Sequence, residues 1–285
     1  MARNMQLSTS ALAKRDRFLG SIGQRLLIMG ILNVTPDSFS DGGQFNSANA
    51  GLAQADRMIA EGADSLDIGG ESTRPGATPV PEAEELRRIE PTIAALAART
   101  ELPISIDTYK AAVARAALRN GAVIVNDVWG FQKDPAMAAV VAESGVAAIV
   151  MHNRAERDDS IDMLDDMRRF FDRTLDIARR AGVLRARLVL DPGIGFGKSA
   201  EQNHAALAGI EILIREYGLP VLIGVSRKSF LGALLDVGVH GRLIGTIAAN
   251  LAAAAYGATI FRVHDVAEHV AALKVFDILR RSRLP

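Results

Sequence analysis

The amino-acid sequence predicts an α/β fold, a single-domain (β/α)8 TIM barrel. Short apolar runs alternate with helical stretches, and eight such pairs follow one another along the chain. Alternating strands and helices imply a parallel sheet, and eight units in 285 residues fit a closed barrel better than an open doubly wound sheet. An open sheet would favour a G-x-G-x-x-G loop after its first strand, whereas residues 33–37 read Asn-Val-Thr-Pro-Asp.

The first strand is Leu26–Leu32, an apolar run without alternation that indicates burial on both faces. The other strands are shorter apolar runs, which we place at 65–70, 104–107, 122–127, 147–152, 187–191, 221–226 and 259–264. The helices carry apolar residues at helical spacing, and most end at a glycine that suits the left-handed conformation. We place the helices at 49–60, 82–98, 111–119, 137–144, 162–181, 203–217, 243–256 and 266–280.

No linker or shift in composition divides the chain after its N-terminus. Residues 1–22 are basic and contain Ser and Ala, but they lack the continuous apolar core of a secretory signal. We therefore expect residues 1–22 to form an N-terminal tail that frays, and residues 23–285 to form the barrel domain.

Composition excludes several classes of protein. Lys plus Arg equals Asp plus Glu at 33 each, so a net charge of zero argues against a nucleic-acid or anionic-membrane partner. The chain has no cysteine, which removes disulfides and thiolate catalysis and fits a reducing, cytoplasmic location. No uncharged apolar run reaches the roughly 18 residues that a membrane span needs.

The predicted helix Leu243–Tyr256 is apolar nearly all round. A helix on the outer ring of a barrel should show a polar stripe toward water. The lack of this stripe predicts that another subunit covers the helix.

Polar residues stand at or just beyond the C-terminal end of every predicted strand. They are Asn33, Asp67 with Glu71, Asp107, Asn126 with Asp127, His152, Asp191, Ser226 with Arg227 and Lys228, and Arg262 with His264. Any one of them could simply cap a loop or helix. All eight strands ending in this way instead predicts an active site at this face of the barrel.

These residues form two chemical groups. One group offers acceptors and an amide for a flat ring with several N–H groups, and consists of Asp107, Asn126 and Asp191. The other offers cations or donors for phosphate or carboxylate, and consists of Arg74, Lys228, Arg262 and His264. The predicted ligand is a polar heterocycle that carries an anionic group.

The stretch Asp191–Lys198 is rich in glycine but fails the P-loop spacing. Its glycines would let the backbone approach a flat ligand, with Phe196 either as a stacking face or as a core aromatic. Residues 226–230 lead toward a helix start, where free N–H groups favour an anion. The histidines show no zinc-ligand spacing, whereas Mg²⁺ needs few protein ligands when phosphates help, and Asn33 is a candidate.

Together these stretches resemble the dihydropteroate synthase family over about Ile28–Ile278. The resemblance rests on motifs in the family's order: Gly30–Gly43, Asp67–Gly76, Ser105–Thr108, Val125–Val128, Met151–His152, Asp191–Lys198, Gly224–Ser229 and Arg262–Asp265. It implies condensation of 6-hydroxymethyl-7,8-dihydropterin diphosphate with 4-aminobenzoate, giving 7,8-dihydropteroate and diphosphate. It also implies a homodimer.

The resemblance further implies a role for individual residues. The pterin would be held by Asp107, Asn126, Asp191 and Lys228. The diphosphate would be held by Thr73, Arg262 and His264, with Mg²⁺ at Asn33. The 4-aminobenzoate would lie against Pro75, Phe196 and Ser229. Residues implied in catalysis are Phe39, Asp41, Arg74 and Lys228.

The implied mechanism needs no strong general base, because the aniline nitrogen is already nucleophilic. Diphosphate leaves once its charge is absorbed, and Asp41 would lie near the pterin methylene cation that remains. Two alternatives stay open: a non-catalytic pterin-binding paralogue, and a pterin-dependent methyltransferase domain. Release of diphosphate from the two substrates with Mg²⁺ distinguishes the synthase from both.

Overall fold

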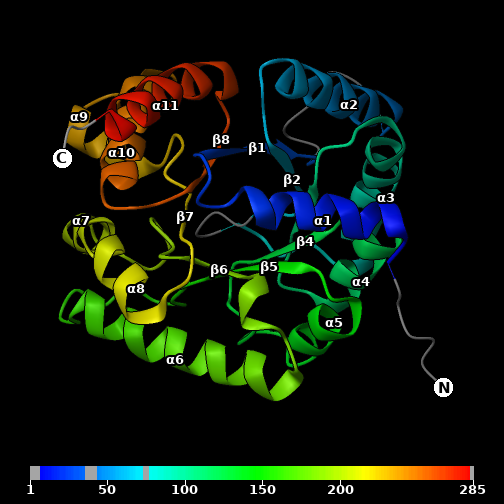
Figure 1. Cartoon of the computed structure of the whole chain (residues 1–285), viewed down its shortest axis with the longest axis horizontal. Helices are drawn as coiled ribbons and strands as arrows, with labels where there is room; N and C mark the ends of the chain where they lie inside the picture. Colours follow the sequence, from blue (N-terminus) through cyan, green and yellow to red (C-terminus); the bar gives the residue numbers. More distant parts are fainter. Residues whose placement is uncertain (1–6, 36–43, 73–76, 283–285) are drawn as a thin grey trace.

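In the computed structural model of this chain, eight parallel strands form a barrel surrounded by helices (Figure 1). The structure describes residues 7–35, 44–72 and 77–282. The strands are β1 (Leu27–Asn33), β2 (Ser65–Gly69), β3 (Ile104–Asp107), β4 (Ile124–Asp127), β5 (Ala147–Met151), β6 (Leu188–Asp191), β7 (Leu222–Ile223) and β8 (Ile260–Val263). Consecutive strands pair from β1 to β6, and β8 pairs with both β1 and β7. A parallel bridge between Leu190 and Val221 joins β6 to β7, so the barrel closes and the predicted fold class is confirmed.

Most of the helices that follow the strands lie close to their predicted positions, but the first begins at residue 44 rather than 49, and the helix over residues 229–235 was not predicted. They are α2 (Gln44–Ala60), α3 (Glu82–Arg99), α4 (Ala111–Arg119), α5 (Met137–Ser144), α6 (Met163–Ala181), α7 (Ala200–Ala208), α8 (Ile210–Tyr217), α9 (Ser229–Leu235), α10 (Leu243–Ala255) and α11 (Val266–Arg281). The predicted helix 203–217 is two helices, interrupted at Gly209. It also begins earlier than predicted, because Ser199 and Gln202 form a capping box at its start.

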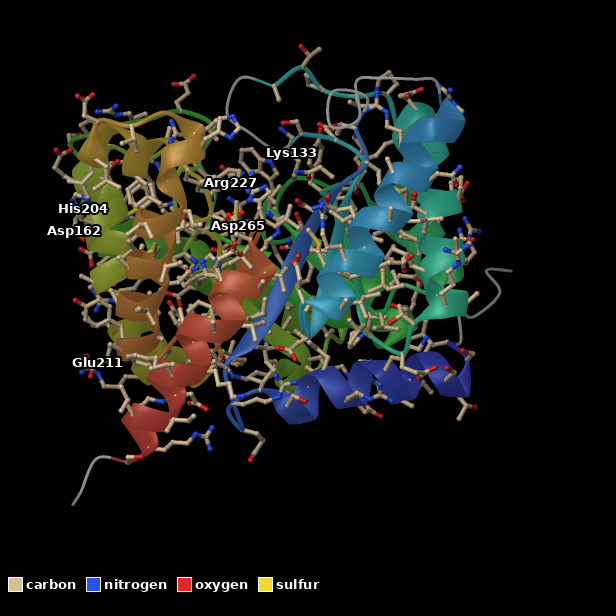
Figure 2. The ribbon with its side chains drawn as sticks, turned by 90° about the horizontal axis from the view of Figure 1, so that it is seen from above. Lys133, Asp162, His204, Glu211, Arg227 and Asp265 are labelled. Atoms are coloured by element: carbon tan, nitrogen blue, oxygen red, sulfur yellow. The ribbon has the colours of Figure 1, made fainter. Side chains whose placement is uncertain are left out.

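The N-terminal segment contains a helix that the sequence reading did not include. Residues Thr9–Ser21 form α1, which begins with Ser8 Oγ accepting from the Ala11 N–H at 3.1 Å. The Lys14 ammonium donates to the carbonyls of Ala97 at 3.1 Å and Thr100 at 2.7 Å. Most of the expected tail is therefore a docked helix, which lies across one end of the barrel (Figure 2).

Two apolar cores result from this arrangement. The larger core lies between the strands and the surrounding helices, while the smaller fills the barrel interior. The smaller core joins Ala11 and Phe18 of α1 to inward-facing strand residues such as Leu27, Met29 and Ile149. Because α1 closes the end where the strands begin, the polar residues at the other ends of the strands form the mouth of the barrel.

Within the described residues, no single helix is long and apolar enough to span a membrane. Only the bent pair Ser229–Leu235 and Val239–Ala255, taken together, meets that length and composition.

Candidate active site

An ion-pair cluster lies inside the barrel mouth, where β2, β3 and β8 end. Arg262 Nε donates to Asp67 Oδ2 at 2.5 Å, and its Nη2 donates to Asp107 Oδ2 at 2.7 Å. Asn126 Nδ2 also donates to Asp67 Oδ2, at 3.0 Å. One guanidinium is thus shared between two carboxylates, and its Nη1 has no hydrogen-bond partner in the described part of the chain.

Burial controls the charge of this cluster. Desolvation raises the pKa of Asp107 to about 7; the Arg262 charge opposes this rise and the Asp67 carboxylate adds to it. Desolvation by itself would lower the pKa of Arg262, but Asp67 and Asp107 together raise it, so this guanidinium stays charged. The two carboxyl groups share one cation and keep oxygens that can accept from a ligand edge rich in N–H donors.

A second pair lies on the opposite wall of the mouth. Asp191 ends β6, and its Oδ1 accepts from the Gly193 N–H at 2.7 Å. Lys228 Nζ donates to the carbonyl of Ile194 and lies 4.5 Å from the centre of the Phe196 ring. Burial lowers the pKa of Lys228 to about 8, and the Asp191 charge opposes that fall. Burial also raises the pKa of Asp191, and Lys228 opposes the rise.

Hydrogen bonds join the loop after β7 to the loop after β8, beside this pair. Ser226 Oγ accepts from the His264 backbone N–H at 3.1 Å and lies 2.9 Å from His264 Nδ1. Arg227 donates two hydrogen bonds to Asp265, from Nε to Oδ2 at 3.0 Å and from Nη2 to Oδ1 (Figure 2). Arg227 has a φ of 57°, which is uncommon for a residue other than glycine. These contacts fix the loop from which Lys228 reaches the mouth.

Asn33 stands at the end of β1, close to the ion-pair cluster. A Cβ on Gly69 would lie 3.4 Å from Asn33 Oδ1 and 3.7 Å from Asp107 Oδ2, so both side chains lie beside this glycine. In the described ranges, no group of three or more His, Cys, Asp or Glu side chains could hold a metal ion. Asn33 Oδ1 is a neutral oxygen of the kind that a hard cation accepts as a ligand.

Comparison with known proteins identifies the family. Residues 29–264 match the family model described as pterin binding enzyme. The chain is 46% identical over 262 residues to the dihydropteroate synthase of Clostridium beijerinckii, covering 92% of this chain and 97% of that protein. The chain belongs to the dihydropteroate synthase family.

Solved structures of dihydropteroate synthases share this barrel. The enzyme from Clostridium difficile, determined in the presence of pteroic acid, superposes with a TM-score of 0.89 at 46% identity, covering 92% of this chain and 99% of that chain. The enzyme from Xanthomonas albilineans, determined with 4-aminobenzoic acid, gives a TM-score of 0.87 at 45% identity, covering 92% and 94%.

The structure brings together most of the predicted site residues that it describes. Asp107, Asn126 and Arg262 meet in one cluster, and Asp191 and Lys228 face the same mouth. Phe196 is half-buried beside Lys228, so it is not a core aromatic, and Ser229 begins α9. Five predicted residues lie outside the described residues: Phe39, Asp41, Thr73, Arg74 and Pro75.

A second ion-pair cluster, next to the ends of β2 and β3, was not predicted from the sequence. Lys110 Nζ donates to Glu85 Oε2 at 2.7 Å, to the Val80 carbonyl at 2.6 Å and to Glu71. Glu85 is 1% exposed, and Thr108 Oγ1 also donates to it at 2.9 Å. Of its members, the sequence singles out Glu71 as a polar residue after a strand, whereas Glu85 in the first turn of a helix indicates by itself only favourable dipole placement.

Proposed function

We propose that this chain joins 6-hydroxymethyl-7,8-dihydropterin diphosphate to 4-aminobenzoate, with release of diphosphate and 7,8-dihydropteroate. The main support is the meeting of Asp107, Asn126, Asp191, Lys228 and Arg262 at one barrel mouth, in a member of the dihydropteroate synthase family. A structure of the Xanthomonas albilineans relative holds 7,8-dihydropteroate, the proposed product.

The pterin ring would lie between the two walls of the mouth. Asp191 keeps Oδ2 for the ligand, because Oδ1 is engaged by Gly193. Asn126 uses its N–H group on Asp67, which leaves its carbonyl oxygen as an acceptor. Lys228 would donate to the pterin carbonyl. Its aliphatic stem packs against Gly195, where an added Cβ would lie 3.1 Å from Lys228 Cδ.

The diphosphate would lie near β8 and β1. Arg262 can offer Nη1, and Ser226 orients His264 through Nδ1. Mg²⁺ would be held by Asn33 with substrate phosphate oxygens, and when bound it would supply charge neutralisation for the leaving group. This side of the site would stabilise diphosphate as the bond to the pterin methylene breaks.

The 4-aminobenzoate would approach over Lys228 and Phe196, with its carboxylate toward Ser229. Its amine then attacks the pterin methylene and loses a proton to solvent as the new C–N bond forms. We retain Asp41, Phe39, Arg74, Thr73 and Pro75 as predicted contributors from the two connections outside the described residues.

The decisive experiment measures diphosphate release from purified protein with both substrates and Mg²⁺, together with 7,8-dihydropteroate by chromatography. Stoichiometric formation of the two products is expected. Pterin binding without either product would instead support the non-catalytic paralogue. Methyl transfer from a methylated pterin, without diphosphate release, would support the methyltransferase domain.

We also propose that two copies of the chain associate through α9, α10 and α11. These helices leave large apolar side chains exposed, among them Leu234 at 65%, Ile244 at 74% and Leu279 at 64%. Exposed apolar surface gathered on neighbouring helices is typical of a protein interface. Sedimentation equilibrium should give a dimer mass for the wild type and a monomer mass for Ile244→Glu. A monomeric wild type at micromolar concentration would contradict this proposal.

A further inference from the structure

Lys198 is a buried lysine whose ammonium is surrounded by acceptors. Its Nζ lies 2.8 Å from His152 Nδ1, 2.8 Å from the Gly193 carbonyl and 3.2 Å from the Phe196 carbonyl. The residue is 8% exposed, and His152 is fully buried. Both residues stand at strand exits or just after them, yet neither has a part in the proposed reaction.

The hydrogen bonds define the protonation of this cluster. An ammonium has three donors and no acceptor, so it matches the two carbonyls and an unprotonated Nδ1. His152 must then carry its proton on Nε2, which lies 3.1 Å from Asp166 Oδ2 and can donate to it. Burial lowers the pKa of His152 to about 4, which keeps the ring neutral. Burial also lowers the pKa of Lys198 to about 7 while Asp191 opposes the fall, so the ammonium form persists below neutral pH.

The segment that Lys198 holds is a turn, in which the Gly193 carbonyl also accepts from the Phe196 N–H at 3.1 Å. Gly193, Gly195 and Gly197 adopt φ angles of 65°, 86° and 58°. A Cβ on Gly193 would lie 1.8 Å from the His152 carbonyl oxygen, so the segment is packed directly onto the β5 exit. Without the ammonium, the Gly193 and Phe196 carbonyls would lose a charged donor in a buried place.

The same segment forms one wall of the mouth. Lys228 is half-buried, binds the Ile194 carbonyl and lies over the Phe196 ring. Lys198 is buried and binds the carbonyls of Gly193 and Phe196. The two lysines therefore hold three different carbonyls of residues 193–196, and only Lys228 has a part in the proposed substrate contacts.

We propose that Lys198 is a positioning residue for the 4-aminobenzoate side of the site, supported by His152 and Asp166. It acts by fixing residues 193–197, and through them the Phe196 ring and the Lys228 ammonium. This inference rests on the proposed function for its kinetic consequence, whereas the fixing of the segment can be tested without any reaction.

The kinetic test compares Lys198→Met with Lys198→Gln and with Lys274→Met, a change at an exposed lysine. A shift of about 1 Å in a positioned group can cost on the order of a hundredfold in rate, so kcat/KM for 4-aminobenzoate should fall by about that factor in Lys198→Met. Pterin affinity measured by calorimetry should change only a few-fold. Lys198→Gln can still donate to both carbonyls and should recover most of the loss. A Lys198→Met variant with a lower melting temperature but wild-type constants per folded molecule would overturn the inference.

Hydrogen exchange supplies a readout that does not depend on activity. Amides of residues 193–197 should exchange faster in Lys198→Met, or in Lys198→Gln to a smaller extent, while those of α6 stay unchanged. Nitrogen NMR of the wild type should show His152 protonated at Nε2 alone. Unchanged exchange in the segment, or a proton on Nδ1, would refute the positioning role even in an active synthase. An inactive wild type with these signatures would refute the proposed function only.

Discussion

Asp191→Asn separates the ligand-binding and structural uses of one carboxylate. Oδ1 already accepts from the Gly193 N–H at 2.7 Å, as expected for an Asp that caps an Asp-Pro-Gly turn. Oδ2 has no hydrogen bond to the described part of the chain, although the residue is only 5% exposed. An asparagine can keep its oxygen on Gly193 and would then present an NH₂ group to the ligand in place of Oδ2. We therefore expect the variant to keep its fold and to lose pterin affinity.

The magnitude follows from the lost acceptor and the new donor. A hydrogen bond to a charged group contributes about 1.5–3 kcal/mol, and a buried unpaired donor costs a further ~1–3 kcal/mol. The combined loss of about 2.5–6 kcal/mol corresponds to on the order of a hundredfold or more in Kd. The melting temperature should change little, because the turn keeps its hydrogen bond.

Isothermal calorimetry with a pterin, together with thermal unfolding, checks this expectation. Asp127→Asn is the matched control, because Asp127 also ends a strand but uses both oxygens on its own turn, at 2.9 Å to Trp129 N and 2.7 Å to Phe131 N. That control should lose stability with a smaller effect on pterin affinity. Pterin binding by Asp191→Asn within a few-fold of wild type would refute the role of Asp191, and Asp107 would be the next carboxylate to test.

Three further changes should give distinct results. Arg262→Met leaves the Asp67 and Asp107 carboxylates buried without their cation and should destabilise the fold by about 3–5 kcal/mol; an unchanged urea midpoint would contradict this. Burial raises the pKa of Asp107 from its ordinary 3.8 to about 7, so the folded state binds this proton more tightly and stability falls as the pH rises between those values. Asp107→Asn cannot titrate and should gain stability relative to wild type across that range, whereas a constant difference in melting temperature would count against the shift. Lys110→Met leaves the buried Glu85 carboxylate without its ammonium partner and should lower the melting temperature more at pH 7 than at pH 4, and an equal loss at both would argue against that pairing.

Much of the fold could be predicted because the pattern of each unit is local. An apolar run followed by polar residues and an amphipathic helix requires only near neighbours, so α4 and α5 agree with their predicted ranges to the residue. The helix α1 could not be predicted in this way, because it is polar overall. Its order depends on Phe18 entering the barrel and on Lys14 reaching distant carbonyls, which are tertiary contacts.

The sequence was enough to predict which residues meet in the site, because parallel strands bring their C-terminal ends together. What each residue binds in the free protein was not predictable. Arg262 was read as an anion ligand on β8, whereas in the structure it also neutralises Asp67 on β2 and Asp107 on β3. That contact exists because the barrel closes and places β8 next to β1, which no pattern within a single unit encodes.

The hydrogen bonds of the carboxylates at the mouth explain how it can be stable and still bind a ligand. Asp67, Asp107 and Asp191 each use one oxygen within the protein, since Asp67 and Asp107 direct Oδ2 to Arg262 and Asp191 directs Oδ1 to Gly193. The Oδ1 atoms of Asp67 and Asp107 are buried without a hydrogen-bond partner among the described residues. Buried acceptors of this kind gain most from a ligand that brings N–H donors, because a buried polar atom left unpaired is costly. The sequence names the carboxylates, but only the closed barrel determines which oxygen of each is left without a hydrogen-bond partner among the described residues.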